Sequence, residues 1–417
     1  MQVFSKIKQL KLPTFILLVF FSIFLSGSTK AQTANSLFES GVYKFKQNDL
    51  PGAITEFTKC IAKNEIFYEA YLERGKCYMA QKKYDYALKD FSKALNVYPN
   101  YYLAYILRAN TYSVIGENKK ALADYAKAIA LKSDKEDAYL SRAEFFMKNN
   151  ENKAALNDLN SALLINNENP KTYYKRALIF ESQKKDNEAI EDFSSALSLD
   201  DKYAEAYYHR GILYEKTHQY LKSASDFGKA IELKIVNKDI IFHKSNAEFL
   251  SGNFEKAIGD LTNLLTNYGV KEPEAYYRRA VSYYKTGKAG EALKDFLKTT
   301  QLNPKNDSAF LWMAKIYAEQ DNLKNAQMYY TKVIVINPAS AEAYAGRAKL
   351  FYGQNKFEQA KNDWDAAIKI NPKSEWFFFR SECKEAMNDK KGMCDDLKSA
   401  QTLGYKKASQ KFDYNCK

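Results

Sequence analysis

The 417-residue sequence contains only eight prolines and three histidines. Few prolines favour a largely helical chain, because proline removes a backbone hydrogen bond and clashes inside a helix. The histidines, His209, His218 and His243, have no third ligand at a spacing typical of a metal site. The sequence also lacks a glycine-rich phosphate loop and a nucleophile elbow. These absences argue against an enzyme, a metal site and a cofactor.

Long apolar runs are equally scarce, and the one that matters lies near the amino terminus. Lysines at positions 6, 8 and 11 precede the eleven-residue run Phe15–Leu25, and small residues follow up to Ala31. The run is short for a bilayer span. The pattern therefore predicts a secretory signal peptide over residues 1–31, cut after about Ala31. We expect an exported protein, periplasmic or extracellular, that meets membranes only through a partner.

The charge balance is positive, but its lysines are not clustered. The predicted signal peptide carries four lysines (Lys6, Lys8, Lys11 and Lys30) and no acidic residue, so its removal lowers the formal net charge from +13 to +9. The remaining lysines are scattered, which indicates a solvated surface rather than a nucleic-acid interface. We therefore expect no nucleic-acid partner.

The region after residue 31 is built from a repeated unit, seen most clearly in residues 68–101. Apolar residues recur at helical spacing before and after a polar joint at residues 81–84, and Pro99 ends the second pattern. Each predicted helix has one apolar stripe that it cannot bury alone. Units of this kind begin near residues 34, 68, 102, 136, 170, 204, 238, 273, 307, 341 and 375. A fixed 34-residue period predicts stacked helical hairpins.

Residues at fixed positions of these units match a known family. In most units position four is aromatic, position eight is Gly or Ala and position twenty is Ala, and Pro99, Pro304, Pro338 and Pro372 occupy position thirty-two. The chain thus resembles the tetratricopeptide repeat family. The resemblance implies an all-α solenoid of about eleven hairpins over residues 32–403. Residues 404–417 are predicted to add a short capping helix.

A charged pattern is internal to the sequence. Position seven is basic and position twenty-three acidic in the same unit, which predicts a partly buried salt bridge between the two helices of each hairpin. The alternative is a row of charges that binds a ligand, which the mutual neutralisation of the two charges disfavours. In the unit from Asp307 both residues are lost together, to Met313 and Tyr329. The predicted pairs are Arg74 with Asp90, Arg108 with Asp124, Arg142 with Asp158, Arg176 with Asp192, Arg210 with Asp226, Lys244 with Asp260, Arg279 with Asp295, and Arg347 with Asp363.

Position five is apolar throughout, and the resemblance places this position on a concave groove formed by the first helices. Such a stripe would bind a peptide or a partner helix. The alternative is that part of it packs against the neighbouring hairpin. The candidate groove residues are Leu72, Ile106, Leu140, Tyr174, Tyr208, Phe242, Tyr277 and Leu311. We expect a protein-interaction scaffold of the cell envelope; a surface or periplasmic component for glycan or nutrient capture is the alternative.

Two further features break the repeat. One residue is inserted near residues 268–272, and Leu264, Thr299 and Val333 replace the small residue at position twenty-seven in three successive units. Together these changes predict altered packing or a bend of the superhelix around residues 264–333. Of the five cysteines, Cys394 lies on the second helix of the last unit and Cys416 just beyond the predicted cap. A disulfide between these two would hold the cap in place, although spacing alone does not establish the required approach.

Overall fold

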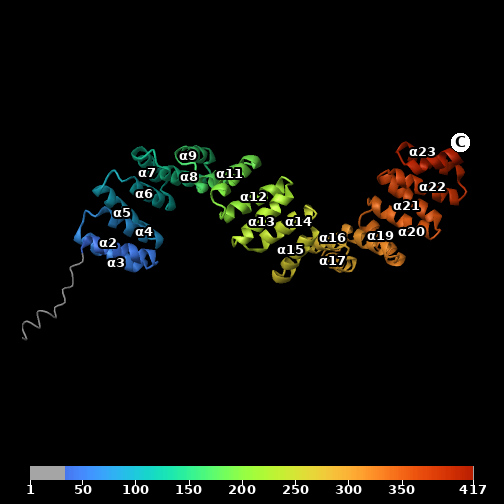
Figure 1. The fold of residues 1–417 in the computed structure, drawn as a ribbon, viewed down its shortest axis with the longest axis horizontal. Helices are drawn as coiled ribbons and strands as arrows, with labels where there is room; N and C mark the ends of the chain where they lie inside the picture. The colour runs from blue at the N-terminus through green and yellow to red at the C-terminus, as the bar shows by residue number, and fades with distance from the viewer. Residues whose placement is uncertain (1–32, 417) are drawn as a thin grey trace, which may run out of the picture. The chain divides into compact units, whose positions relative to one another are not determined.

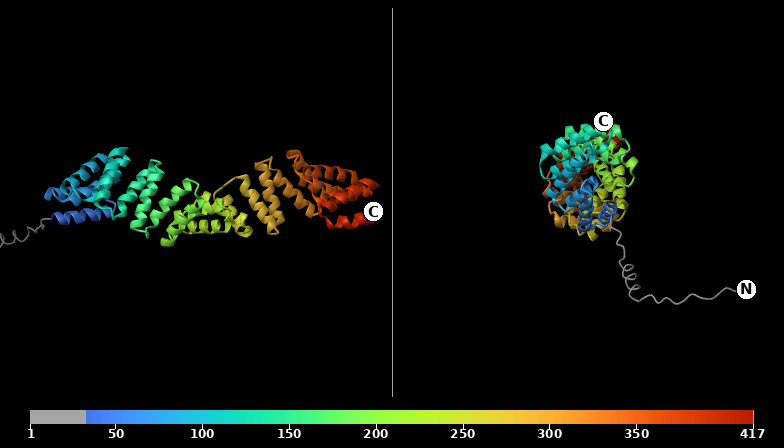
Figure 2. Two further views of the ribbon diagram at one scale, coloured as in Figure 1. Left: turned by 90° about the horizontal axis from the view of Figure 1, so that it is seen from above. Right: turned by 90° about the vertical axis from the view of Figure 1, so that its left-hand side faces the viewer.

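A computed structural model describes residues 33–416, so the predicted signal peptide lies outside the described residues. Within this range the chain forms 23 α-helices and no strand. Within each of the two compact units described below, consecutive helices pair as antiparallel hairpins, and hairpins that follow one another in the sequence pack side by side (Figures 1 and 2). The predicted all-α solenoid is therefore confirmed.

The chain divides into two compact units, of which the first ends at Lys184. Its helices are α2 (Ala34–Lys46), α3 (Leu50–Lys63), α4 (Tyr68–Ala80), α5 (Tyr84–Val97), α6 (Tyr102–Val114), α7 (Asn118–Leu131), α8 (Glu136–Lys148), α9 (Asn152–Ile165) and α10 (Pro170–Ser182).

The second unit begins at Lys185. Its helices are α11 (Asp186–Leu199), α12 (Ala204–Lys216), α13 (Tyr220–Glu232), α14 (Lys238–Leu250), α15 (Phe254–Asn267), α16 (Pro273–Lys285), α17 (Ala289–Leu302), α18 (Asp307–Glu319), α19 (Leu323–Ile336), α20 (Ala341–Gly353), α21 (Phe357–Ile370), α22 (Ser374–Ala386), α23 (Lys390–Thr402) and α24 (Lys406–Asn415). None of the described helices is long and apolar enough to cross a bilayer.

The turn inside each hairpin uses one residue in the left-handed backbone region, always at position fifteen. Gly116 and Gly252 adopt it without strain because they have no Cβ. Asn48, Asn150, Asn355 and Asn388 are also suited to it, whereas Lys82 (φ 59°) adopts it at a steric cost. This residue ends one helix, and the next begins two residues later, which gives the tight antiparallel connection.

The core of each hairpin lies where position eight faces position twenty-four. Phe91 on α5 is fully buried, and a Cβ added to Gly75 on α4 would lie 2.5 Å from its ring. The same buried ring recurs as Phe57 and Tyr125 in the first unit, and as Phe227 and Phe296 in the second. Small residues at position eight thus allow the two helices to approach closely, and a larger side chain there would overpack the core.

Candidate binding surface

The structure places the predicted groove residues at the junctions between successive first helices. Leu72 and Ile106 are buried, with 4% and 6% of their surface exposed. Their burial leaves little of either side chain accessible to a partner and does not support the prediction that they are anchors. Each packs in a core cluster that extends into the next hairpin, next to Ala104 for Leu72 and Ala138 for Ile106. Leu140 and Tyr174, also in the first unit, are only half-buried.

In the second unit, four predicted residues share one surface. We call this the first-helix face: the side of α12, α14, α16 and α18 that carries Tyr208, Phe242, Tyr277 and Leu311. All four are half-buried, with their inner parts against core clusters and their outer parts accessible. Tyr208 packs on Phe227 and Tyr277 on Phe296, with ring centroids 6.2 and 5.9 Å apart.

Polar side chains tie the neighbouring helices of the first-helix face together. Glu215 on α12 accepts hydrogen bonds from two residues of α14, Asn246 and His243, the latter through Nδ1 at 2.7 Å. Asn246 in turn accepts one from Arg278 on α16, whose guanidinium lies 5.5 Å from the Phe242 ring centroid. On α18, Trp312 Nε1 donates to the Tyr277 hydroxyl at 3.2 Å. The aromatic residues are thus held in fixed positions.

This environment shifts two pKa values. Burial raises the pKa of Glu215, but hydrogen bonds from His243 and Asn246, with the charges of His243 and Arg278, outweigh it and lower the pKa below its ordinary value. Burial also raises the pKa of Tyr277, although the hydrogen bond from Trp312 opposes the rise. Glu215 is therefore a carboxylate and Tyr277 a neutral phenol near pH 7.

The histidines at position six support packing rather than a metal site. His209 and His243 stack on the buried rings of Phe193 and Phe227, with centroids 5.6 Å apart in each pair. Among residues 33–416, no group of three or more His, Cys, Asp and Glu side chains converges as a metal site would require. The third histidine, His218, is exposed in the turn before α13 and bonds to the Tyr220 hydroxyl.

The structure brings the predicted arginine–aspartate pairs together. Arg108 donates through Nε and Nη2 to the two carboxylate oxygens of Asp124, at 2.7 and 2.8 Å. The same two-point geometry joins Arg74 to Asp90, Arg142 to Asp158, Arg210 to Asp226, Arg279 to Asp295 and Arg347 to Asp363. Lys244 makes a single contact to Asp260 at 2.5 Å. Arg176 and Asp192 belong to different units, so their pairing stays a prediction.

Each pair is partly buried, and burial carries a cost. Asp226 is 5% exposed, and burial raises its pKa although hydrogen bonding to Arg210 opposes the rise. Burial also disfavours the charged form of Arg210, but the bonds to Asp226 raise its pKa overall. The guanidinium and the carboxylate are both largely removed from water, so removing one partner leaves the other charge poorly solvated.

The sequence-based prediction misses a third residue that bonds to most of the arginines in these pairs. We call the resulting series of contacts along the stack the ladder. The remaining guanidinium nitrogen, Nη1, bonds to position twenty-five of the preceding hairpin: Arg108 to Ser92 at 3.1 Å and Arg210 to Ser194 at 2.9 Å. Thr58, Asn160, Thr262 and Thr331 serve Arg74, Arg176, Arg279 and Arg347 in the same way. The sequence does contain a signal for this contact. Position twenty-five is polar in most hairpins that precede one with an arginine at position seven, and it is Gly228 in the hairpin before Lys244.

The last hairpin contains an arginine–aspartate pair that the fixed 34-residue period does not predict. Arg380 on α22 bonds to both oxygens of Asp396 on α23, and its Nη1 lies 2.6 Å from Asp365. The loop before α22 is one residue shorter than the usual four, so α22 begins at Ser374 rather than 375. A register that allowed this deletion would have placed Arg380 at position seven.

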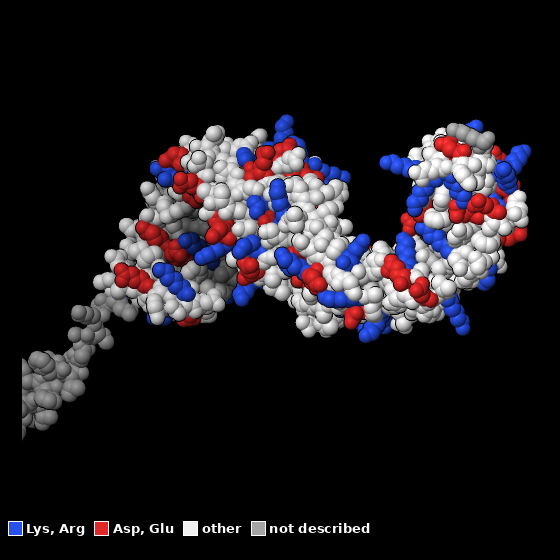
Figure 3. All heavy atoms as spheres, turned by 45° about the vertical axis from the view of Figure 1, so that its right-hand side comes forward, with Lys and Arg blue, Asp and Glu red and all other residues white. Residues whose placement is uncertain are grey.

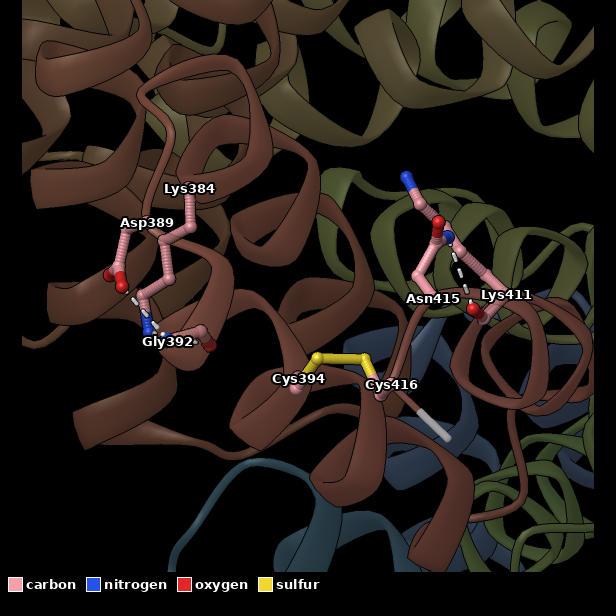
Figure 4. Close-up of a disulfide and its surroundings, with 7 residues drawn as sticks. All are labelled: Lys384, Asp389, Gly392, Cys394, Lys411, Asn415 and Cys416. Carbon is pink, nitrogen blue, oxygen red and sulfur yellow. Dashed lines mark hydrogen bonds between the residues drawn. A yellow bond between two sulfur atoms is a disulfide. The ribbon is translucent and has the colours of Figure 1, made fainter.

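The carboxyl-terminal helix α24 packs on the last hairpin, and a disulfide joins Cys394 of α23 to Cys416 (Figure 4). Lys411 of α24 contacts Glu382 and Glu385 of α22. The other three cysteines, Cys60, Cys77 and Cys383, are buried free thiols, and burial raises the pKa of each. They are therefore poor nucleophiles.

Comparisons with known proteins can now be set beside this geometry. Models of the tetratricopeptide repeat match residues 68–101, 273–306 and 308–340, and a model described as TPR repeat matches residues 177–217. No curated protein matches the sequence.

Similar solved structures share little sequence with the chain. Yeast Tom70 is 16% identical over 92% of this chain and 95% of that one, with a TM-score of 0.37. A tetratricopeptide repeat protein from Parabacteroides merdae is 20% identical over 60% of this chain and 99% of that one, at 0.41. The C-terminal part of one from Cytophaga hutchinsonii is 20% identical over 56% and 95%, at 0.44. The repeat matches, which coincide with observed helical hairpins, show that the chain contains tetratricopeptide repeats.

Proposed function

We propose that the protein is a non-enzymatic scaffold of the cell envelope that binds a peptide or a partner helix on its first-helix face. Protein–protein interaction is the function that tetratricopeptide repeats support in general. The observation that carries the finer proposal is the row of half-buried Tyr208, Phe242 and Tyr277 across α12, α14 and α16. Rigid aromatic side chains with an accessible edge are effective anchors, because little rotational freedom is lost when a partner packs on them.

The surface charge supports a protein partner over a nucleic acid. Lys and Arg side chains are interspersed with Asp and Glu on the face drawn in Figure 3. Nucleic-acid binding requires basic residues gathered into a patch or stripe. The buried arginines do not supply one, because the ladder pairs them with carboxylates.

Export is the second part of the proposal. It rests on the signal-peptide pattern of residues 1–31, and the disulfide between Cys394 and Cys416 fits an oxidising compartment. Amino-terminal sequencing of the protein isolated from its native cells tests it. A mature chain that starts at Gln32 or close to it is the expected result, and an intact segment 1–31 on a cytosolic protein would contradict export.

Cross-linking in intact cells, followed by purification and mass spectrometry, tests the binding surface. We expect Tyr208→Ala with Tyr277→Ala to lose partners that the unaltered protein captures. A matched control, Leu221→Ala with Val335→Ala, changes two exposed apolar residues on the second helices α13 and α19 and should retain them. Circular dichroism melting verifies that both variants fold. Equal capture by the two folded variants would place the binding site elsewhere.

A further inference from the structure

The first-helix face contains a cavity at the point where the repeat is interrupted. It has a volume of about 260 Å³ and lies between α14 and α16, beside the α15–α16 loop. Phe242, Leu264 and Val270 form its apolar lining. Leu264 belongs to the core, whereas Phe242 and Val270 are half-buried and present surface to the cavity. Pockets for drug-sized ligands measure about 300–1,000 Å³, so this cavity suits a single side chain.

The corner that holds the cavity carries fewer aromatic residues than a corner of the first unit. At the α5–α6 corner of the first unit, Tyr68, Tyr98 and Tyr101 fill the corresponding space, with ring centroids 5.0–5.7 Å apart. At the α15–α16 corner, Lys238 stands where Tyr68 does, and the loop contains Gly269 with φ +62°. A Cβ added at Gly269 would meet no atom within 4 Å. Of the three positions only that of Tyr98 keeps an aromatic residue here, Tyr268, and that side chain is 40% exposed.

The rim of the cavity is acidic, although the protein as a whole is basic. Three carboxylates, Asp239, Glu272 and Glu274, stand against one ammonium group, Lys238. Glu274 is bound by Arg278 at 2.7 Å, but Asp239 and Glu272 are exposed and have no ion-pair partner within residues 33–416. Two unpaired carboxylates beside an apolar cavity complement a basic ligand that carries an apolar group.

We propose that this cavity binds one aliphatic or aromatic side chain of a peptide segment whose neighbouring residue is Lys or Arg. The side chain enters between Phe242 and Val270, and the cation lies against Asp239 and Glu272. The inference rests on the proposed function, because it specifies the partner sequence that part of the first-helix face recognises. It narrows the partner class from any amphipathic segment to one with a basic residue beside its anchor.

Selection from a random twelve-residue peptide library displayed on phage tests the proposal with the intact purified chain. We expect the unaltered protein to enrich peptides with Leu, Ile, Phe or Met within two positions of Lys or Arg. Val270→Trp fills the cavity and should abolish this enrichment. Asp239→Lys with Glu272→Lys leaves the cavity open and should change the favoured neighbour from basic to acidic.

A charge-matched control separates recognition from a general electrostatic effect. Glu188→Lys with Glu291→Lys reverses two exposed carboxylates on the second helices α11 and α17, and it should select the same peptides as the unaltered protein. The proposal is overturned if no motif is enriched, if Val270→Trp recovers the same peptides, or if the basic neighbour persists on the reversed rim. The proposed scaffold function would survive each of these results, provided that cross-linked partners still depend on Tyr208 and Tyr277.

Discussion

At the scale of single residues, the arginine at position seven connects helices of two successive hairpins. Arg210 bonds to Asp226 within its own hairpin and to Ser194 in the hairpin before it. One guanidinium therefore joins three helices. Where the arginine is replaced by Met313, an apolar arrangement takes over: Tyr329 stacks on Phe310 and Tyr317, with centroids 6.0 and 5.6 Å apart. An arginine–aspartate pair and a set of stacked aromatic rings are thus alternative ways of joining the two helices of a hairpin at these positions.

Removing one partner of this ladder should destabilise the second unit. We expect Asp226→Ala to lower the free energy of unfolding by about 1–3 kcal/mol, because Arg210 keeps its partly buried charge without a carboxylate. Replacing both, Arg210→Met with Asp226→Leu, should cost less than the single change. Denaturant titration measures both effects. Asp201→Ala, at an exposed loop position, is the control, and a loss for Asp226→Ala no larger than for this variant would contradict the argument.

Glu215 should give stability a dependence on acidic pH. Its pKa is lower in the folded state than the ordinary value of 4.5, so the carboxylate stabilises the fold above about pH 4.5 and loses this contribution as the pH falls through the folded value. His243 and Arg278 are the basic side chains that face it. We expect Glu215→Gln to be less stable than the unaltered chain near pH 6 and the difference to shrink towards about pH 3. A difference that is constant over this range in thermal melts would contradict the assigned role.

The residue scale also shows what the sequence could reveal. The arginine–aspartate pairs were predictable because both members recur with the period and disappear together at Met313 and Tyr329. The burial of Leu72 and Ile106 was not, since an apolar residue at position five serves equally well as an anchor or as packing. Which of the two applies depends on the residues opposite it in the next hairpin. These contacts lie about thirty residues away and have no separate pattern of their own.

At the scale of helices and loops, the period predicts each hairpin but not the length of each connection. The loop before α16 is one residue longer than most and the loop before α22 one shorter. The longer loop contributes Val270 and Glu272 to the lining of the cavity beside Phe242, and the shorter one shifts Arg380 into register with Asp396. Loop lengths decide which side chains meet, and a single residue is easily missed when a register is extrapolated.

The disulfide should matter mainly to the last helix. It closes a loop with a sequence separation of 22, and loops of this size stabilise a fold by about 2–4 kcal/mol. We expect Cys394→Ser with Cys416→Ser to increase hydrogen exchange in α24, while the packing of Ala408 and Phe412 retains part of its protection. Reducing the unaltered protein should have the same effect and leave the double variant unchanged. Unaltered exchange in α24 after complete reduction would show that the disulfide does not hold it.

At the scale of the whole molecule, stability is expected to be local. Within each unit the extensive helix contacts join elements that are adjacent in the chain or next but one. A stack of this kind has no single core, and its stability is approximately a sum of hairpin and interface contributions. Damage to one hairpin should therefore spread to its immediate neighbours and fade with distance along the stack.

Hydrogen exchange of the Asp226→Ala variant measures this spread. Asp226 lies on α13, so we expect faster exchange in α12–α15, where Arg210 loses its carboxylate and the neighbouring cluster around Phe227 loosens. Helices α20–α23 belong to the same unit but share no contact with that cluster, and their exchange should stay unchanged. A matched change at the far end, Asp363→Ala on α21, should produce the opposite distribution. Uniform acceleration through the second unit in both variants would mean that it unfolds as one cooperative block, and the nearest-neighbour description would then fail.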